Sequence, residues 1–532
     1  MAKIVITEID ETLPVSVAES TDIVYVPGFA DTNQNCFILT IPNATPVHPD
    51  GASTASALVG TTGGSATPKR TDYNTHSTAP QYCINTFDKK AWYYDTEATD
   101  DWSDVTAYID PYPENEPILC GSLSEFVKNF GDAPYQFNKE GSEESVHDRV
   151  VTPSFTVGSG TETYELYEEG DYEKSYIYAR ELIALGVPVL YENFVNRTHT
   201  PTETYKKDYP SVTALYGALN TMLDNISDLG EYTVKYITSG AYPTFEIVAT
   251  SPTTSDTSSQ AVGMCKSAAT RGDAVALIDH TNKPGRDLTG DNSVYGSVNA
   301  SGSIFKTAVA DGGAKEYAPY ATLMTPWAYY SVPNETSAVA SIKQAMPASF
   351  GYLLSLARSI KTNANWLAVA GVARGVVPNI VALNTTSKLT NSIADSYQLR
   401  TGVSINAITN IKPYGLTIWG NRTLLDNETN LTAHSFLNTR NMVNDIKKVA
   451  YTVAKSLMFE QNSEQLWLAF KSGIIPTLNQ MQSGQGLTGY KILRGTTDEK
   501  AKLVATIKLY PIYAVEEFEI EIILKDEEVT VQ

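Results

Sequence analysis

The chain has 532 residues, 42% of them hydrophobic, and carries 39 Lys and Arg against 60 Asp and Glu, a formal net charge of −21. This length predicts several domains with cores of their own and excludes a small disulfide-stapled scaffold. The acidic balance argues against wrapping nucleic acid, so partner surfaces should be locally basic or apolar. Cys36, Cys83, Cys120 and Cys265 lie far apart with no CxxC pair, which disfavours a disulfide framework and a zinc ribbon.

Both ends of the chain alternate apolar and polar side chains, as edge strands do. Residues 3–9 (KIVITEI) show this pattern, and Phe518, Ile520 and Ile522 alternate with acidic residues near the other end. An exposed edge strand is a template for pairing, so these segments pair either within their own sheet or with neighbouring subunits. The N-terminus lacks the apolar run of a signal peptide, and Arg374 and Pro378 interrupt the most apolar window, so we expect neither a signal peptide nor a transmembrane span.

The first third of the chain mixes short strands with irregular sequence. Residues 23–26 and 36–41 predict strands, whereas residues 42–80 are rich in Gly, Ser, Thr, Ala and Pro and predict a long surface loop. Residues 121–132 (GSLSEFVKNFGD) predict a short capped helix with Phe126 and Phe130 on one face.

Helix and strand patterns alternate between about residues 118 and 350. Helices are predicted at 176–186, 212–226 and 258–271, and strands at 187–194, 232–237, 244–249 and 274–278. This alternation is typical of an α/β domain. We therefore predict a multidomain, mixed α/β fold.

Residues 389–424 (LTNSIADSYQLRTGVSINAITNIKPYGLTIWGNRTL) form the most informative stretch. Ile393, Tyr397 and Leu399 predict a short helix that ends at Gly402. The residues from 403 to 411 then alternate as in a half-buried strand, and Lys412–Gly415 (KPYG) predicts a hairpin turn into a second strand at 416–419.

The last part of the chain contains the best amphipathic helix, at residues 436–459. Its apolar stripe comprises Val443, Ile446, Ala450, Val453 and Leu457. Arg440, Lys447, Lys448 and Lys455 fall within an arc of roughly 100° on another side. This basic stripe is either a solvated face or a docking site. A second helix should be capped by Asn462 and Gln465 and carry Trp467 and Phe470. Gly473 and Pro476 should kink or end it. Residues 503–513 predict a strand.

Catalytic motifs are scarce. None of the six histidines lies within helical reach of another, and the sequence contains no GxSxG, no Walker A lysine and no GxGxxG. Asp279 and His280 end a predicted α/β strand, where open sheets place active sites, but an Asp there also commonly caps a turn. We therefore expect no enzyme activity, no cofactor and no metal site.

One ordered pattern in residues 389–424 resembles the signature of contractile tail sheath proteins of phages and related injection machines. It falls on Leu389, Thr390, Asp395, Leu399, Gly402, Val403, Ile405, Asn406, Ile408, Gly415, Ile418, Trp419, Gly420, Arg422, Thr423 and Leu424. The helix at 121–132, the pieces at 265–280 and 320–330, and Ala370, Gly371, Arg374 and Gly375 are similar to further parts of the family pattern, and residues 42–117 lie outside it.

The resemblance implies a structural subunit that polymerises as stacked, hexameric rings around an inner tail tube and contracts to drive the tube through a cell envelope. It also implies strand exchange between subunits through Ile4, Val5, Ile6, Phe518, Ile520 and Ile522, and a tube-facing stripe of Arg440, Lys447, Lys448 and Lys455. The expected partners are other copies of the chain, the tail tube protein, and baseplate and tail terminator proteins, with no direct nucleic acid and no membrane insertion. The expected location of the chain is a virion tail, which is assembled in the host cytoplasm.

The expected divisions are an N-terminal arm at 1–25, a strand pair with a variable insertion at 26–117, a middle α/β domain at 118–355, a C-terminal core at 356–515 and a C-terminal arm at 516–532. Two alternatives stay open. The chain could be a sheath-like subunit of a bacterial secretion or injection system, or an α/β hydrolase carried on a particle.

Overall fold

The computed structural model describes residues 24–29, 37–39, 81–85, 90–94, 102–104, 117–130, 154–156, 163–165, 171–194, 220–240, 260–279, 294–333, 341–360, 364, 366–385, 389–428, 431–497 and 499–516. The predicted terminal strands at residues 3–9 and 518–524, most of the insertion at 42–117, residues 212–219 of the predicted helix at 212–226, the predicted strand at 244–249, and His280 lie outside these residues.

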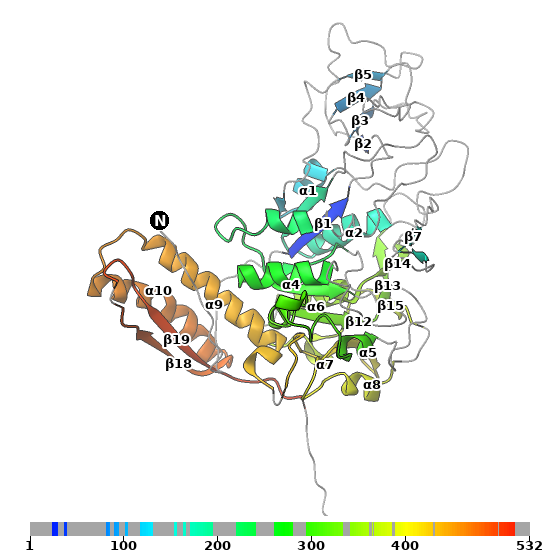
Figure 1. Ribbon diagram of the computed structural model, residues 1–532. Helices are drawn as coiled ribbons and strands as arrows, with labels where there is room; N and C mark the ends of the chain where they lie inside the picture. Colours follow the sequence, from blue (N-terminus) through cyan, green and yellow to red (C-terminus); the bar gives the residue numbers. More distant parts are fainter. Residues whose placement is uncertain are drawn as a thin grey trace, which may run out of the picture.

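An eight-stranded sheet forms the body of the molecule (Figure 1). Its order is β17-β16-β12-β11-β10-β1-β9-β6; the six central strands are parallel, and both edge strands are antiparallel to their neighbours. The strands are β1 (Val24–Phe29), β6 (Ile118–Cys120), β9 (Val189–Phe194), β10 (Tyr236–Ile237), β11 (Val275–Asp279), β12 (Ala321–Thr325), β16 (Asn406–Ile411) and β17 (Gly415–Trp419). The sheet therefore crosses the boundary expected at residues 355/356.

Apolar side chains cover both faces of this sheet because they alternate along its strands. Val275 and Leu277 join one core cluster, with α2 (Asp171–Ala184) and α6 (Ala348–Ile360). Ala276 and Ile278 join the other, with α4 (Gln260–Arg271). Further helices of the body are α1 (Leu123–Phe130), α5 (Val294–Asn299), α7 (Gly371–Arg374) and α8 (Asn391–Ser396), with 3₁₀ turns at Val309–Asp311, Ala318–Tyr320 and Ala433–Ser435.

Smaller sheets accompany the body. Strands β13 (Ala328–Pro333), β14 (Ser341–Met346) and β15 (Ile380–Leu383) form an antiparallel sheet of order β14-β13-β15. A four-stranded antiparallel sheet contains β2 (Phe37–Leu39), β3 (Gln81–Asn85), β4 (Lys90–Tyr94) and β5 (Trp102–Asp104), and β7 (Ser154–Thr156) pairs with β8 (Thr163–Glu165).

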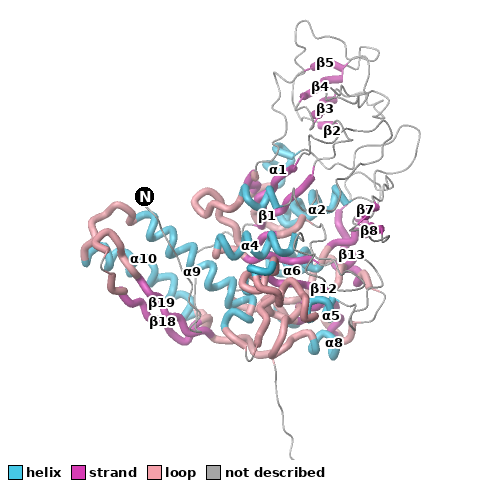
Figure 2. Tube along the Cα trace, viewed as in Figure 1, coloured by secondary structure: helices cyan, strands magenta, loops and turns pink. Residues whose placement is uncertain are grey.

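A C-terminal subdomain projects from the body (Figure 2). It contains the outer half of α9 (Leu437–Ser456), α10 (Glu464–Ser483) and the hairpin of β18 (Leu487–Arg494) and β19 (Ala505–Pro511). Its core joins Ile446, Trp467, Ile474 and Leu478 to the inner face of the hairpin.

Several local predictions need correction. Helix α10 is capped by Ser463, whose side chain accepts from Leu466 N, and not by Asn462 or Gln465. It also continues through Pro476, which lies on an exposed position where water can replace the lost backbone hydrogen bond. Gly402 is not a helix cap, because α8 ends at Ser396 and Gly402 exchanges backbone hydrogen bonds with Asn427.

Candidate functional site

The residues of the 389–424 pattern build one polar network. Thr390 caps α8 by accepting from Ile393 N, and Asp395 on that helix accepts from Trp419 Nε1 at 2.6 Å. The α8 turn is thereby attached to the end of β17. The predicted hairpin is present, with Ile411 opposite Gly415. Residues 406–409 of β16 are buried on both faces and not half-buried, because Ile408 packs in one core cluster and Ala407 in the other, and the strand becomes exposed only at Asn410.

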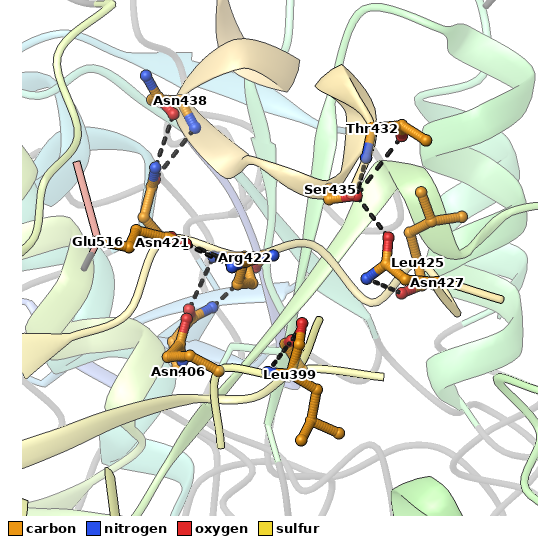
Figure 3. Close-up of polar contacts among 12 residues, drawn as sticks. Leu399, Asn406, Asn421, Arg422, Leu425, Asn427, Thr432, Ser435, Asn438 and Glu516 are labelled. Atoms are coloured by element: carbon orange, nitrogen blue, oxygen red, sulfur yellow. Dashed lines mark hydrogen bonds and ion pairs between the residues drawn. The ribbon is translucent and has the colours of Figure 1, made fainter. Parts of the chain in front are cut away.

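Asn406 holds the backbone of Arg422 (Figure 3). Its Oδ1 accepts from Arg422 N at 2.8 Å, while its Nδ2 donates to Arg422 O and to Thr322 Oγ1, both at 2.8 Å. Thr322 Oγ1 donates to the same carbonyl at 2.8 Å. Asn406 is 1% exposed, so its amide is a buried group with each polar atom paired, as burial requires.

Gly420 lets the chain pass close to this network. Its φ is 149°, and a Cβ there would lie 2.5 Å from Gln398 Nε2 and 2.6 Å from Asn406 Oδ1. No side chain fits between these atoms. The family-pattern glycine is therefore required here by close packing as well as by backbone conformation.

The two residues on either side of Arg422 attach the network to the start of α9. Asn421 Nδ2 donates to Asn438 Oδ1 at 2.6 Å (Figure 3). Asn438 Nδ2 in turn donates to Trp366 O at 3.0 Å. Thr423 Oγ1 donates to His434 O at 2.6 Å. The network thus fixes where α9 begins relative to the sheet.

The side chain of Arg422 reaches the last described segment of the chain. Its Nε donates to Glu516 Oε1 at 3.0 Å and its Nη2 donates to Glu516 Oε2. The guanidinium lies 4.8 Å from the ring centroid of Phe436, which in turn contacts the ring of Tyr513 at 5.2 Å. Arg422 is 3% exposed, so this charge is removed from water.

The predicted basic stripe is not a single exposed surface. Arg440 is 1% exposed, donates to Pro319 O at 3.0 Å and to His434 Nδ1 at 2.5 Å, and stacks on Tyr320. Lys447 is half-buried and donates to Tyr320 Oη at 2.9 Å. The ammonium of Lys448 is buried without a hydrogen-bond partner among the described residues, and burial lowers its pKa. Lys455 is the exposed member of the four.

The inner half of α9 packs against buried charged and polar groups of the body, at the edge of the eight-stranded sheet where its parallel strands begin. Lys235 Nζ lies 3.1 Å from Asp445 Oδ2, with the two side chains 2% and 1% exposed. Asn444 Nδ2 donates to Ala274 O at 3.0 Å, just before β11. These contacts explain why the basic side chains on this half of the helix face the body instead of solvent.

Asp279 acts as a buried cap. Its carboxylate accepts from Ser349 N at 3.3 Å and from Ser349 Oγ at 2.7 Å at the start of α6, and from Ser239 Oγ at 3.2 Å. Burial raises its pKa to about 7. With 1% exposure, this carboxyl is not accessible to a substrate in this conformation.

Sequence reasoning missed two features of this site. It assigned no strand to β18, although Tyr490 and Ile492 follow period two, because Gly489 interrupts the pattern. It also assigned no partner to the side chain of Arg422, since Glu516 is 94 residues away.

None of the helices in the described part of the chain is long and apolar enough to cross a membrane.

No protein-family model and no curated protein matches the chain. Among solved structures, the contracted sheath complex of the extracellular contractile injection system PVC aligns over 99% of this chain and 98% of its own, with a TM-score of 0.46 and 14% identity. The contracted helical sheath of the anti-feeding prophage aligns over 98% of both chains, with a TM-score of 0.47 and 14% identity. A chain of the contracted anti-feeding prophage baseplate covers 78% of this chain and 90% of its own, with a TM-score of 0.48 and 17% identity.

Proposed function

We propose that this chain is the structural subunit of a contractile sheath that polymerises as stacked, hexameric rings around a tail tube and contracts to drive the tube through a cell envelope. The observation that carries this is the position of the sheath-like pattern. Its residues Asn406, Gly420 and Arg422 form one network, and that network holds residues 512–516, which precede the predicted terminal strand. The particle is a phage tail or a phage-derived injection system, with baseplate and tail terminator proteins at its ends and assembly in the host cytoplasm.

The strand exchange predicted for both termini has a suitable acceptor in the β18–β19 hairpin. Within the described residues, this sheet has two strands and hence two open edges. Residues 517–522 read EFEIEI, so a strand there would place Glu517, Glu519 and Glu521 on one face and Phe518, Ile520 and Ile522 on the other. We propose that this strand and the one containing Ile4, Val5 and Ile6 join these edges on neighbouring subunits.

The tube contact is proposed for the outer half of the C-terminal subdomain. Residues 437–511 contain ten Lys and Arg against five Asp and Glu, in a chain of net charge −21. Of the four residues first predicted to face the tube, Lys455 is exposed, whereas Arg440 is buried and Lys447 and Lys448 are partly buried on α9. An acidic groove on the tube would complement this subdomain by charge, and such a contact can be released.

Negative-stain electron microscopy of the purified chain tests the proposal, with and without tube protein. Tubes or rings are expected from the full chain, and a variant ending at residue 516 should stay folded and unpolymerised. A full chain that stays monodisperse under all conditions, with tube protein present, would contradict the sheath assignment. Polymerisation of the shortened chain would contradict strand exchange while leaving the sheath assignment intact.

A further inference from the structure

The chain leaves the C-terminal hairpin and returns to the body before its described part ends. After β19, Ile512 N donates to Gly486 O at 3.1 Å, which keeps the segment against the subdomain. The next contacts, of Tyr513 with Phe436 and of Glu516 with Arg422, are made to the body. Residues 512–516 therefore connect the two parts of the molecule outside the α9 connection.

This segment buries little apolar surface of its own. Ile512 and Tyr513 are 41% exposed and Val515 is 68% exposed. Hydrophobic burial alone therefore does not fix its position. The buried contact at its end is the pair of parallel bonds between the Arg422 guanidinium and the Glu516 carboxylate. Such bidentate pairs restrict orientation as well as distance.

Burial raises the pKa of the Glu516 carboxyl, although Arg422 acts in the opposite direction. The ion pair thus offsets only part of the cost of removing the carboxylate from water. A pair of this kind contributes more to a specified geometry than to net stability, and removing one partner leaves an uncompensated buried charge.

We propose that Arg422 is the anchor of the chain's own C-terminal segment: its bidentate pair with Glu516 fixes where, and in which direction, residues 517–532 leave the body. The role of these residues in joining a neighbouring subunit rests on the proposed function, but the anchor itself does not. Arg422 is a positioning residue in this scheme, acting through the carboxylate that it holds.

Hydrogen exchange of the unassembled protein, followed by mass spectrometry, tests the anchor. In Arg422→Met and in Glu516→Ala, the amide of Ile512, which donates to Gly486 O, should exchange at least tenfold faster, while those within β18 and β19 stay as in the original chain. The matched control is Lys315→Met, which removes an exposed ion pair with Glu428 of 2.8 Å and should leave exchange at Ile512 unchanged. The double variant Arg422→Met with Glu516→Leu, which leaves no buried charge, should exchange more slowly than either single variant.

Unchanged exchange at Ile512 in Glu516→Ala would overturn the proposal. That variant also decides the matter if Arg422→Met fails to fold, since Glu516 lies at the surface end of the pair, with a side chain 26% exposed. Because exchange is measured without polymer, its outcome is independent of the sheath assignment. A chain that never polymerises refutes the proposed function and leaves the anchor to be judged by exchange alone.

Discussion

Replacing Gly420 by Ala tests whether the close packing of the motif network is required for folding. The added Cβ would meet Gln398 Nε2 at 2.5 Å and Asn406 Oδ1 at 2.6 Å. Gln398 Nε2 donates to Ile405 O at 2.6 Å, and Asn406 Oδ1 accepts from Arg422 N at 2.8 Å, so neither atom can retreat without breaking a hydrogen bond.

Two costs add up in this variant. An L-residue at a φ of 149° costs about 1–3 kcal/mol, and leaving one buried polar group unpaired costs about 1–3 kcal/mol. We expect Gly420→Ala to lower the free energy of unfolding by about 2–6 kcal/mol. Gly415→Ala is the matched control, since Gly415 also has a positive φ, of 92°, but a Cβ added there would meet nothing within 4 Å.

Urea unfolding of unassembled protein, monitored by circular dichroism, measures both variants. Hydrogen exchange in β16 then shows whether the loss is located at Asn406. If Gly420→Ala loses no more stability than Gly415→Ala, the close approach contributes nothing, and the reasoning from the Asn406 and Gln398 contacts is wrong.

Three further predictions concern charged groups. Burial raises the Asp279 pKa from 3.8 to about 7, so the folded state binds this proton more tightly than the unfolded state and stability should fall as pH rises between these values. Asp279→Asn should therefore flatten the pH dependence of the melting temperature measured by calorimetry, and an unchanged slope would exclude this carboxyl as its source. Asp445→Ala should cost about 3–5 kcal/mol by removing the carboxylate paired with the buried Lys235 ammonium, and Lys235→Met with Asp445→Leu should recover part of this cost in a double-mutant cycle. Full additivity of the two single changes would show that the pair is not coupled. Lys455→Glu should weaken co-sedimentation with tube protein without changing stability, and salt should act in the same direction; salt-independent binding would place the tube contact elsewhere.

Sequence patterns located most elements whose contacts are local. The helices α2 and α4 and the strands β9 and β11 fall where alternating helix and strand patterns predicted them, because each presents a regular apolar face. The error at α10 has a physical cause. Gly473 lies where the helix approaches α9 closely, and a Cβ added there would lie 2.8 Å from Val453 Cγ1, so the glycine reflects helix packing and not a helix end.

The candidate site was only partly predictable for a different reason. The pattern identified Asn406, Gly420 and Arg422 as a group, but the roles of Asn406 and Arg422 depend on Thr322 and Glu516, which are distant in the sequence. Helical periodicity likewise placed Arg440 and Lys455 on one side of α9. It could not show that the first lies against the body and the second beyond it, because a helical wheel carries no information about where a helix leaves its domain.

The two halves of α9 differ in chemistry, and this difference has a mechanical consequence. The inner half is fixed by directional contacts, among them Asn438 with Trp366 O, Asn444 with Ala274 O, and Asp445 with Lys235. The outer half packs through apolar side chains that tolerate small sliding. Buried hydrogen bonds and ion pairs specify one orientation, since any other leaves their groups unpaired. A force applied to the β18–β19 hairpin would therefore reach the sheet through these polar contacts as well as through residues 512–516, and the polar contacts of the inner half of α9 help to set the orientation of the hairpin relative to the body.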